Sequence, residues 1–70
     1  MNISSTIDFG EAIRKRRKEL GYTQGYISEV TGFSTSFISD LENGKPSTEL
    51  GKALHLAHML SLDLDLSERN

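Results

Sequence analysis

Three glycines divide most of this chain into short segments, and this division constrains the fold more than any other feature. Gly21, Gly32 and Gly44 each stand where an apolar pattern with helical spacing ends. Glycine readily adopts the left-handed backbone conformation that terminates a helix. Thr23 and Ser34 stand where the next segments begin, and their side-chain oxygens can cap a helix. The pattern predicts short helices joined by tight turns.

The caps and the apolar spacing predict an all-α fold with four helices, over residues 9–20, 24–31, 35–43 and 48–60. The first helix is expected to begin with a capping box of Asp8 and Glu11, and the last with Ser47 as its cap. No repeat or linker divides the 70 residues. We therefore expect a single domain, residues 1–70, in which residues 8–61 form the helical part.

The C-terminal segment has a different pattern. Residues 62–66 alternate strictly between leucine and aspartate, which is the period of a strand with one buried face. A single strand leaves half of its backbone hydrogen-bonding groups unpaired, and no other part of the chain resembles a strand. The natural partner is the same strand of a second copy. Residues 62–67 are therefore predicted to form a short β-strand that pairs across a homodimer.

The predicted last helix also indicates a dimer, because it is apolar on two sides. One side is expected to pack on the other three helices and consists of Leu50, Ala53, Leu54 and Ala57. The second side has no partner left within so small a fold, and an apolar helix face has to be buried. The expected dimer interface combines this second side with the strand, through Leu56, Met59, Leu62, Leu64 and Leu66.

The charge of the chain argues against strong non-specific attraction to nucleic acid. Ten acidic residues outweigh eight basic ones, which gives a net charge of −2 and an isoelectric point near 5.5. Five of the basic residues are consecutive, at positions 14–18. They can make one helix face locally positive, although an ordinary solvated face is the alternative.

Several function classes lack the residues that they need. The chain has no cysteine, no leader pattern and no apolar run long enough to cross a membrane, so a cytoplasmic protein without a membrane partner is expected. His55 and His58 are three residues apart, but no third ligand completes a metal site. No serine or aspartate is arranged with a histidine as a nucleophile with its base. We expect no enzymatic activity, no cofactor and no small-molecule ligand.

The two central helices, with the turn around Gly32, have the spacing of a helix-turn-helix unit. The motifs GYTQ at residues 21–24, TGFS at 31–34 and ISDLENGK at 38–45 resemble the phage-repressor-like (Cro/C1, xenobiotic-response-element) family. The resemblance covers residues 9–60. Phe37, the run LENGKPS and the C-terminal leucines are most similar to the HipB-type antitoxins.

This resemblance implies a four-helix, lambda-repressor-like DNA-binding domain, with Ser28 in place of the alanine usual in the family. It implies a homodimer that binds a pseudo-palindromic operator in double-stranded DNA and represses transcription. HipB-type proteins also hold a HipA-type serine/threonine kinase toxin. Two alternatives remain open: a stand-alone phage-type or restriction-control regulator, and a protein-interaction antitoxin that does not bind DNA.

The expected DNA contacts follow from positions in the helix-turn-helix unit. Base contacts are expected from short polar residues on the exposed face of the second helix of this unit: Ser34, Thr35, Ser36, Ser39 and Asp40. Phosphate or sugar contacts are expected from Tyr22, Thr23, Gln24, Phe37, Asn43, Lys45, Arg14 and Arg16. The resemblance also implies an internal ion pair between Arg17 and Glu42, the alternative being two solvated surface charges.

Overall fold

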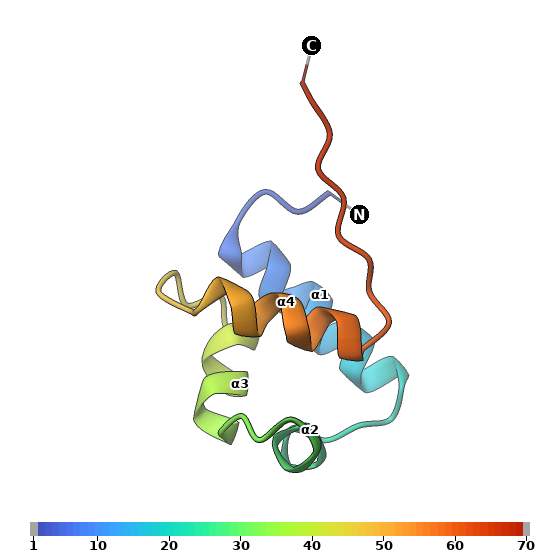
Figure 1. The fold of residues 1–70 in the computed structure, drawn as a ribbon, viewed down its shortest axis with the longest axis vertical. Helices are drawn as coiled ribbons and strands as arrows, with labels where there is room; N and C mark the ends of the chain where they lie inside the picture. The colour runs from blue at the N-terminus through green and yellow to red at the C-terminus, as the bar shows by residue number, and fades with distance from the viewer. Residues whose placement is uncertain (1, 70) are drawn as a thin grey trace.

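The computed structural model describes residues 2–69 and contains four helices. They are α1 (Thr6–Glu19), α2 (Gln24–Thr31), α3 (Thr35–Glu42) and α4 (Leu50–Met59). Figure 1 shows α2 and α3 below α1 and α4, while the C-terminal segment leaves the helices in an extended path. The four-helix prediction is confirmed. None of the helices within residues 2–69 has the length and apolar character that a membrane span requires.

The first helix begins one turn earlier than predicted. Ser5, not Asp8, is its N-cap, and the Ser5 hydroxyl oxygen accepts a hydrogen bond from the Asp8 backbone N–H at 3.0 Å. The Asp8 carboxylate lies inside the first turn, where it accepts from the backbone N–H of Ser4 at 3.2 Å. A serine followed three residues later by an acidic residue thus caps the helix, and the Asp8–Glu11 capping box was a wrong prediction.

The bounds of α2 agree with the prediction, and α3 begins at the predicted residue and ends one residue earlier. The Thr23 hydroxyl oxygen accepts from the backbone N–H of Tyr26 at 3.0 Å, and Ser34 caps α3 in the same way. Gly32 has a φ of 78°, in the left-handed region, so it ends α2 and begins the turn. Both helices are therefore bounded by interactions within a few residues of their ends.

The last helix is shorter than predicted. It begins at Leu50 after the N-cap Glu49, which makes no side-chain capping bond, so Ser47 is not the cap. Residues 45–48 instead form a turn around Pro46, in which the Thr48 hydroxyl donates to the Lys45 carbonyl oxygen at 2.8 Å. The hydroxyl and the backbone N–H of Thr48 are thus bonded to the Lys45 carbonyl oxygen and do not take part in the first turn of a helix.

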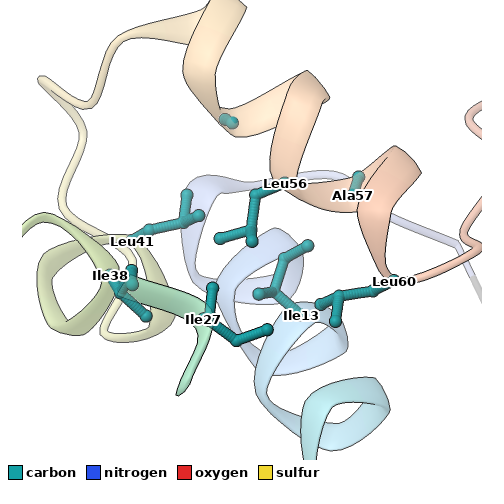
Figure 2. Close-up of a cluster of buried hydrophobic side chains, with 8 residues drawn as sticks. Ile13, Ile27, Ile38, Leu41, Leu56, Ala57 and Leu60 are labelled. Atoms are coloured by element: carbon teal, nitrogen blue, oxygen red, sulfur yellow. The ribbon is translucent and has the colours of Figure 1, made fainter. Parts of the chain in front are cut away.

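Each helix contributes side chains to one apolar core. The largest fully buried side chains are Ile13, Ile27, Ile38, Leu56 and Leu60. Figure 2 shows them converging on a common centre from all four helices and the residue after α4. Burying one such side chain contributes about 1.5–3 kcal/mol, so this cluster supplies a large part of the driving force for folding.

The orientation predicted for α4 was wrong in part, since Ala53 and Ala57 are buried as predicted but Leu50 is not. Leu56 is buried in the core of the single chain, whereas Leu50 is 69% exposed. The buried side of α4 continues into the residue after it and consists of Ala53, Leu56, Ala57 and Leu60. These residues follow the i, i+3, i+4, i+7 spacing of one helix face, and the two alanines allow close packing. Leu56 therefore cannot lie in a dimer interface.

The other residues predicted for that interface have different exposures. Met59 is exposed, and so are Leu64 and Leu66 in the C-terminal segment. Leu62 packs against the core, and its backbone N–H donates to the Ala57 carbonyl oxygen at 2.9 Å. Within residues 2–69 no strand is formed, so the strand paired across two copies stays a prediction.

Candidate nucleic-acid interface

The turn between α2 and α3 brings two short helices together with their polar groups satisfied. The Ser28 hydroxyl on α2 donates to the Phe33 carbonyl oxygen at 2.6 Å, and the Thr31 hydroxyl oxygen accepts from the Phe33 backbone N–H at 3.0 Å. The departure from alanine at Ser28 therefore leaves no unpaired hydroxyl. The helix-turn-helix unit is closed by local hydrogen bonds as well as by the core.

The residues predicted to contact bases lie on the solvent side of α3. Ser34, Thr35 and Ser36 are exposed around its first turn, and Ser39 and Asp40 are half-exposed one turn further on. The opposite side of α3, with Ile38, Leu41 and Glu42, is buried. The structure thus gathers all five predicted base-contact residues on one accessible surface, which we call the α3 face: Ser34, Thr35, Ser36, Ser39 and Asp40.

Behind the α3 face, a buried ion pair ties α1 to α3. Arg17 Nε lies 2.6 Å from Glu42 Oε2, and a second Arg17 nitrogen lies 2.9 Å from Oε1. The two residues are only 8% and 6% exposed. Hydrogen bonding to Glu42 raises the pKa of Arg17 above its ordinary value, against the lowering effect of burial. The structure therefore contains the Arg17–Glu42 pair that the family resemblance implied.

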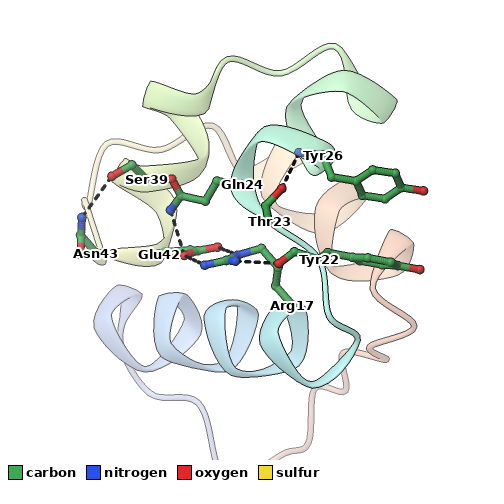
Figure 3. Close-up of polar contacts among 8 residues, drawn as sticks. All are labelled: Arg17, Tyr22, Thr23, Gln24, Tyr26, Ser39, Glu42 and Asn43. Atoms are coloured by element: carbon green, nitrogen blue, oxygen red, sulfur yellow. Dashed lines mark hydrogen bonds and ion pairs between the residues drawn. The ribbon is translucent and has the colours of Figure 1, made fainter.

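Gln24 extends this pair into a network of three helices, which sequence reasoning missed. Its Nε2 donates to Glu42 Oε1 at 3.1 Å, while Arg17 also donates to the Tyr22 carbonyl oxygen at 2.8 Å (Figure 3). The Glu42 carboxylate thus accepts from both α1 and α2. A buried carboxylate needs several hydrogen-bond donors. For Glu42, this need is the one sequence-level reason to expect a second donor besides Arg17.

Close packing also holds α1 against α3. A Cβ atom at Gly10 would collide with the Leu41 carbonyl oxygen, and it would lie 2.7 Å from that of Glu42. Only glycine allows α1 to approach the end of α3 this closely. Together with the ion pair, this contact fixes the orientation of α3 in the domain.

The residues predicted to contact phosphate on the α2 side of α3 differ in their surroundings. Thr23 is exposed at the N-terminus of α2, whereas the Gln24 amide nitrogen is already bound to Glu42. The Tyr22 ring packs against that of Tyr26 in a tilted arrangement, with 4.9 Å between the ring centroids. In Figure 3 both rings extend away from Ser39 and Asn43. The structure therefore separates the Tyr22 ring from the α3 face.

At the other end of α3, Asn43 and Lys45 are exposed. The Asn43 Nδ2 lies 3.4 Å from the Ser39 hydroxyl oxygen, and the Lys45 ammonium lies 3.3 Å from Asp40 Oδ2. Both side chains thus adjoin the α3 face, in agreement with their predicted positions.

Phe37 does not point outward as predicted. The side chain is half-buried against the core. Its ring centroid lies 5.3 Å from that of Phe33 and 5.5 Å from the Lys52 ammonium nitrogen. Phe37 precedes the buried Ile38 in α3, and its ring packs against the core on the side of Lys52 in α4. The predicted outward orientation was therefore wrong in part, and a contact between the half-exposed ring and the sugar–phosphate edge stays a prediction.

Arg16 also lies elsewhere than predicted. Its Nε donates to the Leu60 carbonyl oxygen at 2.8 Å, and its guanidinium lies 3.8 Å from Glu19. The last carbonyl groups of a helix lack intrahelical partners, and Arg16 satisfies one of them at the end of α4. Arg16 is therefore engaged with α4, while Arg14 is exposed on α1.

Comparison with known proteins places this arrangement among helix-turn-helix proteins. Residues 13–66 match the helix-turn-helix family model HTH_3. A protein of Sinorhizobium fredii (strain NBRC 101917 / NGR234), named as the uncharacterized HTH-type transcriptional regulator y4mF, is 36% identical over 64 residues, which cover 91% of this chain and 84% of the relative.

Two solved structures have the same fold. A complex of a HipB variant with the O2 20mer has a TM-score of 0.88 over 100% of this chain and 97% of that chain. A complex of HipB with the O4 20mer has a TM-score of 0.87, over 100% of this chain and 99% of that chain. The sequence identity is 24% in both comparisons, so they establish the fold.

Proposed function

Because the chain belongs to the helix-turn-helix family of transcriptional regulators, we propose that it is a dimeric repressor that reads operator DNA with α3. One observation carries the proposal: Glu42 holds α3 on its buried side, and the accessible α3 face carries short polar side chains. A helix of this kind fits the major groove, where base edges carry a sequence-dependent pattern of donors and acceptors.

The chemistry of the α3 face suggests how sequence is read. Its hydroxyl groups can donate to or accept from bases directly or through water, and the Thr35 methyl group can contact the methyl group of thymine. None of these residues is an arginine, asparagine or glutamine, the usual bidentate readers. Specificity would therefore depend partly on water-mediated contacts and DNA shape.

Phosphate contacts would flank α3 on two sides. On one side, the backbone N–H groups of Gln24 and Gly25, the first two of α2, have no intrahelical partner and can donate to a phosphate oxygen. On the other side, Asn43 and Lys45 extend from the end of α3. Contacts on both sides would orient the helix in the groove.

The exposed apolar residues after α4 support a homodimer. Leu64 is 42% exposed and Leu66 is fully exposed, on a segment that extends away from the helices (Figure 1). Pairing this segment with its counterpart would bury these leucines, with Met59 nearby, and would satisfy the backbone hydrogen bonds. The two copies of α3 in the dimer would then bind half-sites about 34 Å apart on the DNA.

Truncation after Leu62 tests the dimer. It removes Leu64 and Leu66 but keeps Leu62, which packs against the core. We expect a folded monomer with weaker operator binding, measured by sedimentation and by anisotropy. The double variant Asp63→Asn/Asp65→Asn, which changes charge but keeps the leucines, should remain dimeric. A truncated chain that is still dimeric at micromolar concentration would exclude the strand pairing.

We further propose that the protein is the antitoxin and autoregulator of a HipA-like kinase module. The support is the fold shared with HipB over nearly the whole of both chains, together with the LENGKPS run and the leucine segment. Co-expression with a neighbouring kinase gene should yield a stable complex and relieve toxicity. Absence of such a gene would favour the stand-alone regulator.

The decisive experiment for DNA binding is a fluorescence-anisotropy titration. The purified protein is titrated with DNA from its own promoter and with unrelated DNA of equal length, at two salt concentrations. We expect selective binding to a two-fold-symmetric fragment that persists at the higher salt concentration. Equal, weak binding to both fragments that disappears with salt would contradict the repressor. It would favour the alternative of a protein-interaction antitoxin.

A further inference from the structure

An ion pair occupies the exposed end of α3, where a DNA-binding surface would ordinarily present an unpaired cation. The Lys45 ammonium lies 3.3 Å from the Asp40 carboxylate, and the two side chains are 55% and 48% exposed. Asp40 belongs to the α3 face, which we propose to face DNA, and Lys45 adjoins that face. An approaching phosphate would therefore compete with Asp40 for the same ammonium group.

The backbone holds these two residues together. The Lys45 N–H donates to the Asp40 carbonyl oxygen at 3.0 Å, and the Gly44 N–H donates to that of Leu41 at 3.0 Å. Gly44 has a φ of 80°. This is the Schellman arrangement of a helix C-terminus, and it positions the lysine directly beside the aspartate. The pair is thus built into the end of the helix.

A second lysine on the same side of α3 is also matched by an acidic residue. Lys52 lies 3.6 Å from Glu49, and its ammonium lies over the Phe37 ring. These two pairs line one hollow between α3 and the start of α4. The side of α3 next to the start of α4 therefore carries as many positive as negative charges in these two pairs. The whole chain is also close to neutral, with a net charge of −2.

We propose that Asp40 is a specificity-determining residue that couples base reading to a phosphate contact. This inference rests on the proposed function. On non-specific DNA, Asp40 retains Lys45 and repels the phosphates. At the operator, Asp40 accepts a hydrogen bond from the N4 amino group of a cytosine, and Lys45 is released to a phosphate oxygen.

The variant Asp40→Asn removes the negative charge and keeps the shape of the side chain. Its affinity for a duplex of random sequence should rise about two- to fivefold at low salt, the range expected for one exposed charge pair. The slope of log K against log salt should steepen by about 0.9, because one more phosphate is neutralised. Glu68→Gln also removes one negative charge, on the exposed C-terminal segment beyond residues 62–67 and away from α3 (Figure 1), and should alter neither quantity appreciably.

Selection from a randomised duplex library tests base reading. The wild type should enrich a site with one cytosine per half-site that depends on Asp40. Asp40→Asn should lose this preference, or exchange it for adenine, and keep the other positions. If Asp40→Asn keeps the base preference of the wild type, or binds non-specific DNA no more tightly than Glu68→Gln does, the role of Asp40 alone is overturned. A wild-type protein that enriches no sequence would overturn the proposed function as well.

Lys45→Gln provides a second test that does not alter Asp40. An ordinary phosphate-binding lysine would weaken binding to all sequences equally when replaced. Here the replacement should weaken operator binding at least twofold more than non-specific binding, since Lys45 reaches phosphate only at the operator. Uniform weakening would contradict the coupling. Thermal unfolding of each variant verifies that the fold is retained.

Discussion

The two sides of α3 differ in what constrains them. The buried side is held by Glu42, which accepts hydrogen bonds from Arg17 on α1 and Gln24 on α2, and by Ile38 in the core. The accessible side carries Ser36, which is exposed, and Ser39, which is half-exposed beside Asn43. One helix of eight residues thus has a structural side and a binding side. Substitutions on the two sides should therefore affect different measurements.

The largest effect is expected from Glu42→Ala. It leaves the Arg17 charge buried without its partner, which costs about 3–5 kcal/mol of the free energy of unfolding. Urea denaturation followed by circular dichroism measures this loss. Glu49→Ala, which removes an exposed acidic residue, should change stability by less than about 1 kcal/mol. Equal losses for the two variants would refute the structural role of Glu42.

On the binding side, Ser39→Arg should act on affinity instead of stability. A long cation in place of a short hydroxyl would obstruct the fit of α3 in the groove, with a loss of about 1–3 kcal/mol for the operator. The dimer and the unfolding curve should be unchanged. Ser67→Arg adds the same charge outside the α3 face and serves as the control in the anisotropy titration. Unchanged operator affinity of Ser39→Arg would disprove the assignment of the α3 face.

Gln24 connects the two sides, so its substitution should affect both measurements. Gln24→Ala removes a hydrogen bond to a charged group, which is worth about 1.5–3 kcal/mol when such a bond is well shielded. Because Gln24 is only half-buried, we expect a loss near the lower end of this range, together with weaker DNA binding. Gln24→Glu, which places a second carboxylate beside Glu42, should destabilise the fold further. Intact stability in Gln24→Glu would contradict the network.

The smallest effect is expected from Phe37→Leu, which tests the corrected position of this side chain. The substitution should cost about 1 kcal/mol of stability, because Phe37 packs against the core and Phe33. Operator affinity should change less than twofold. A large loss of affinity with unchanged stability would restore the outward contact first predicted for Phe37.

Signals close to each other in the sequence predicted the helix-turn-helix unit. Thr23, Gly32, Ser34 and Gly44 bound α2 and α3 through hydrogen bonds or backbone conformations that involve only neighbouring residues. For that reason their positions were predictable to within one residue. The first helix was misplaced at its start because Ser5 and Asp8 are both good capping residues, and local pattern alone does not choose between them.

The sequence by itself therefore determined the four helices, the turn between α2 and α3, and the exposed polar residues that begin α3. The tertiary structure decided which side of α4 is buried. Both sides are apolar in sequence, and only the packing of the other helices determines which one they cover. It also decided that Phe37 turns toward α4, that Arg16 binds the Leu60 carbonyl, and that Gln24 joins the Arg17–Glu42 pair. These contacts join residues far apart in the chain, and their partners exist only once the helices have packed.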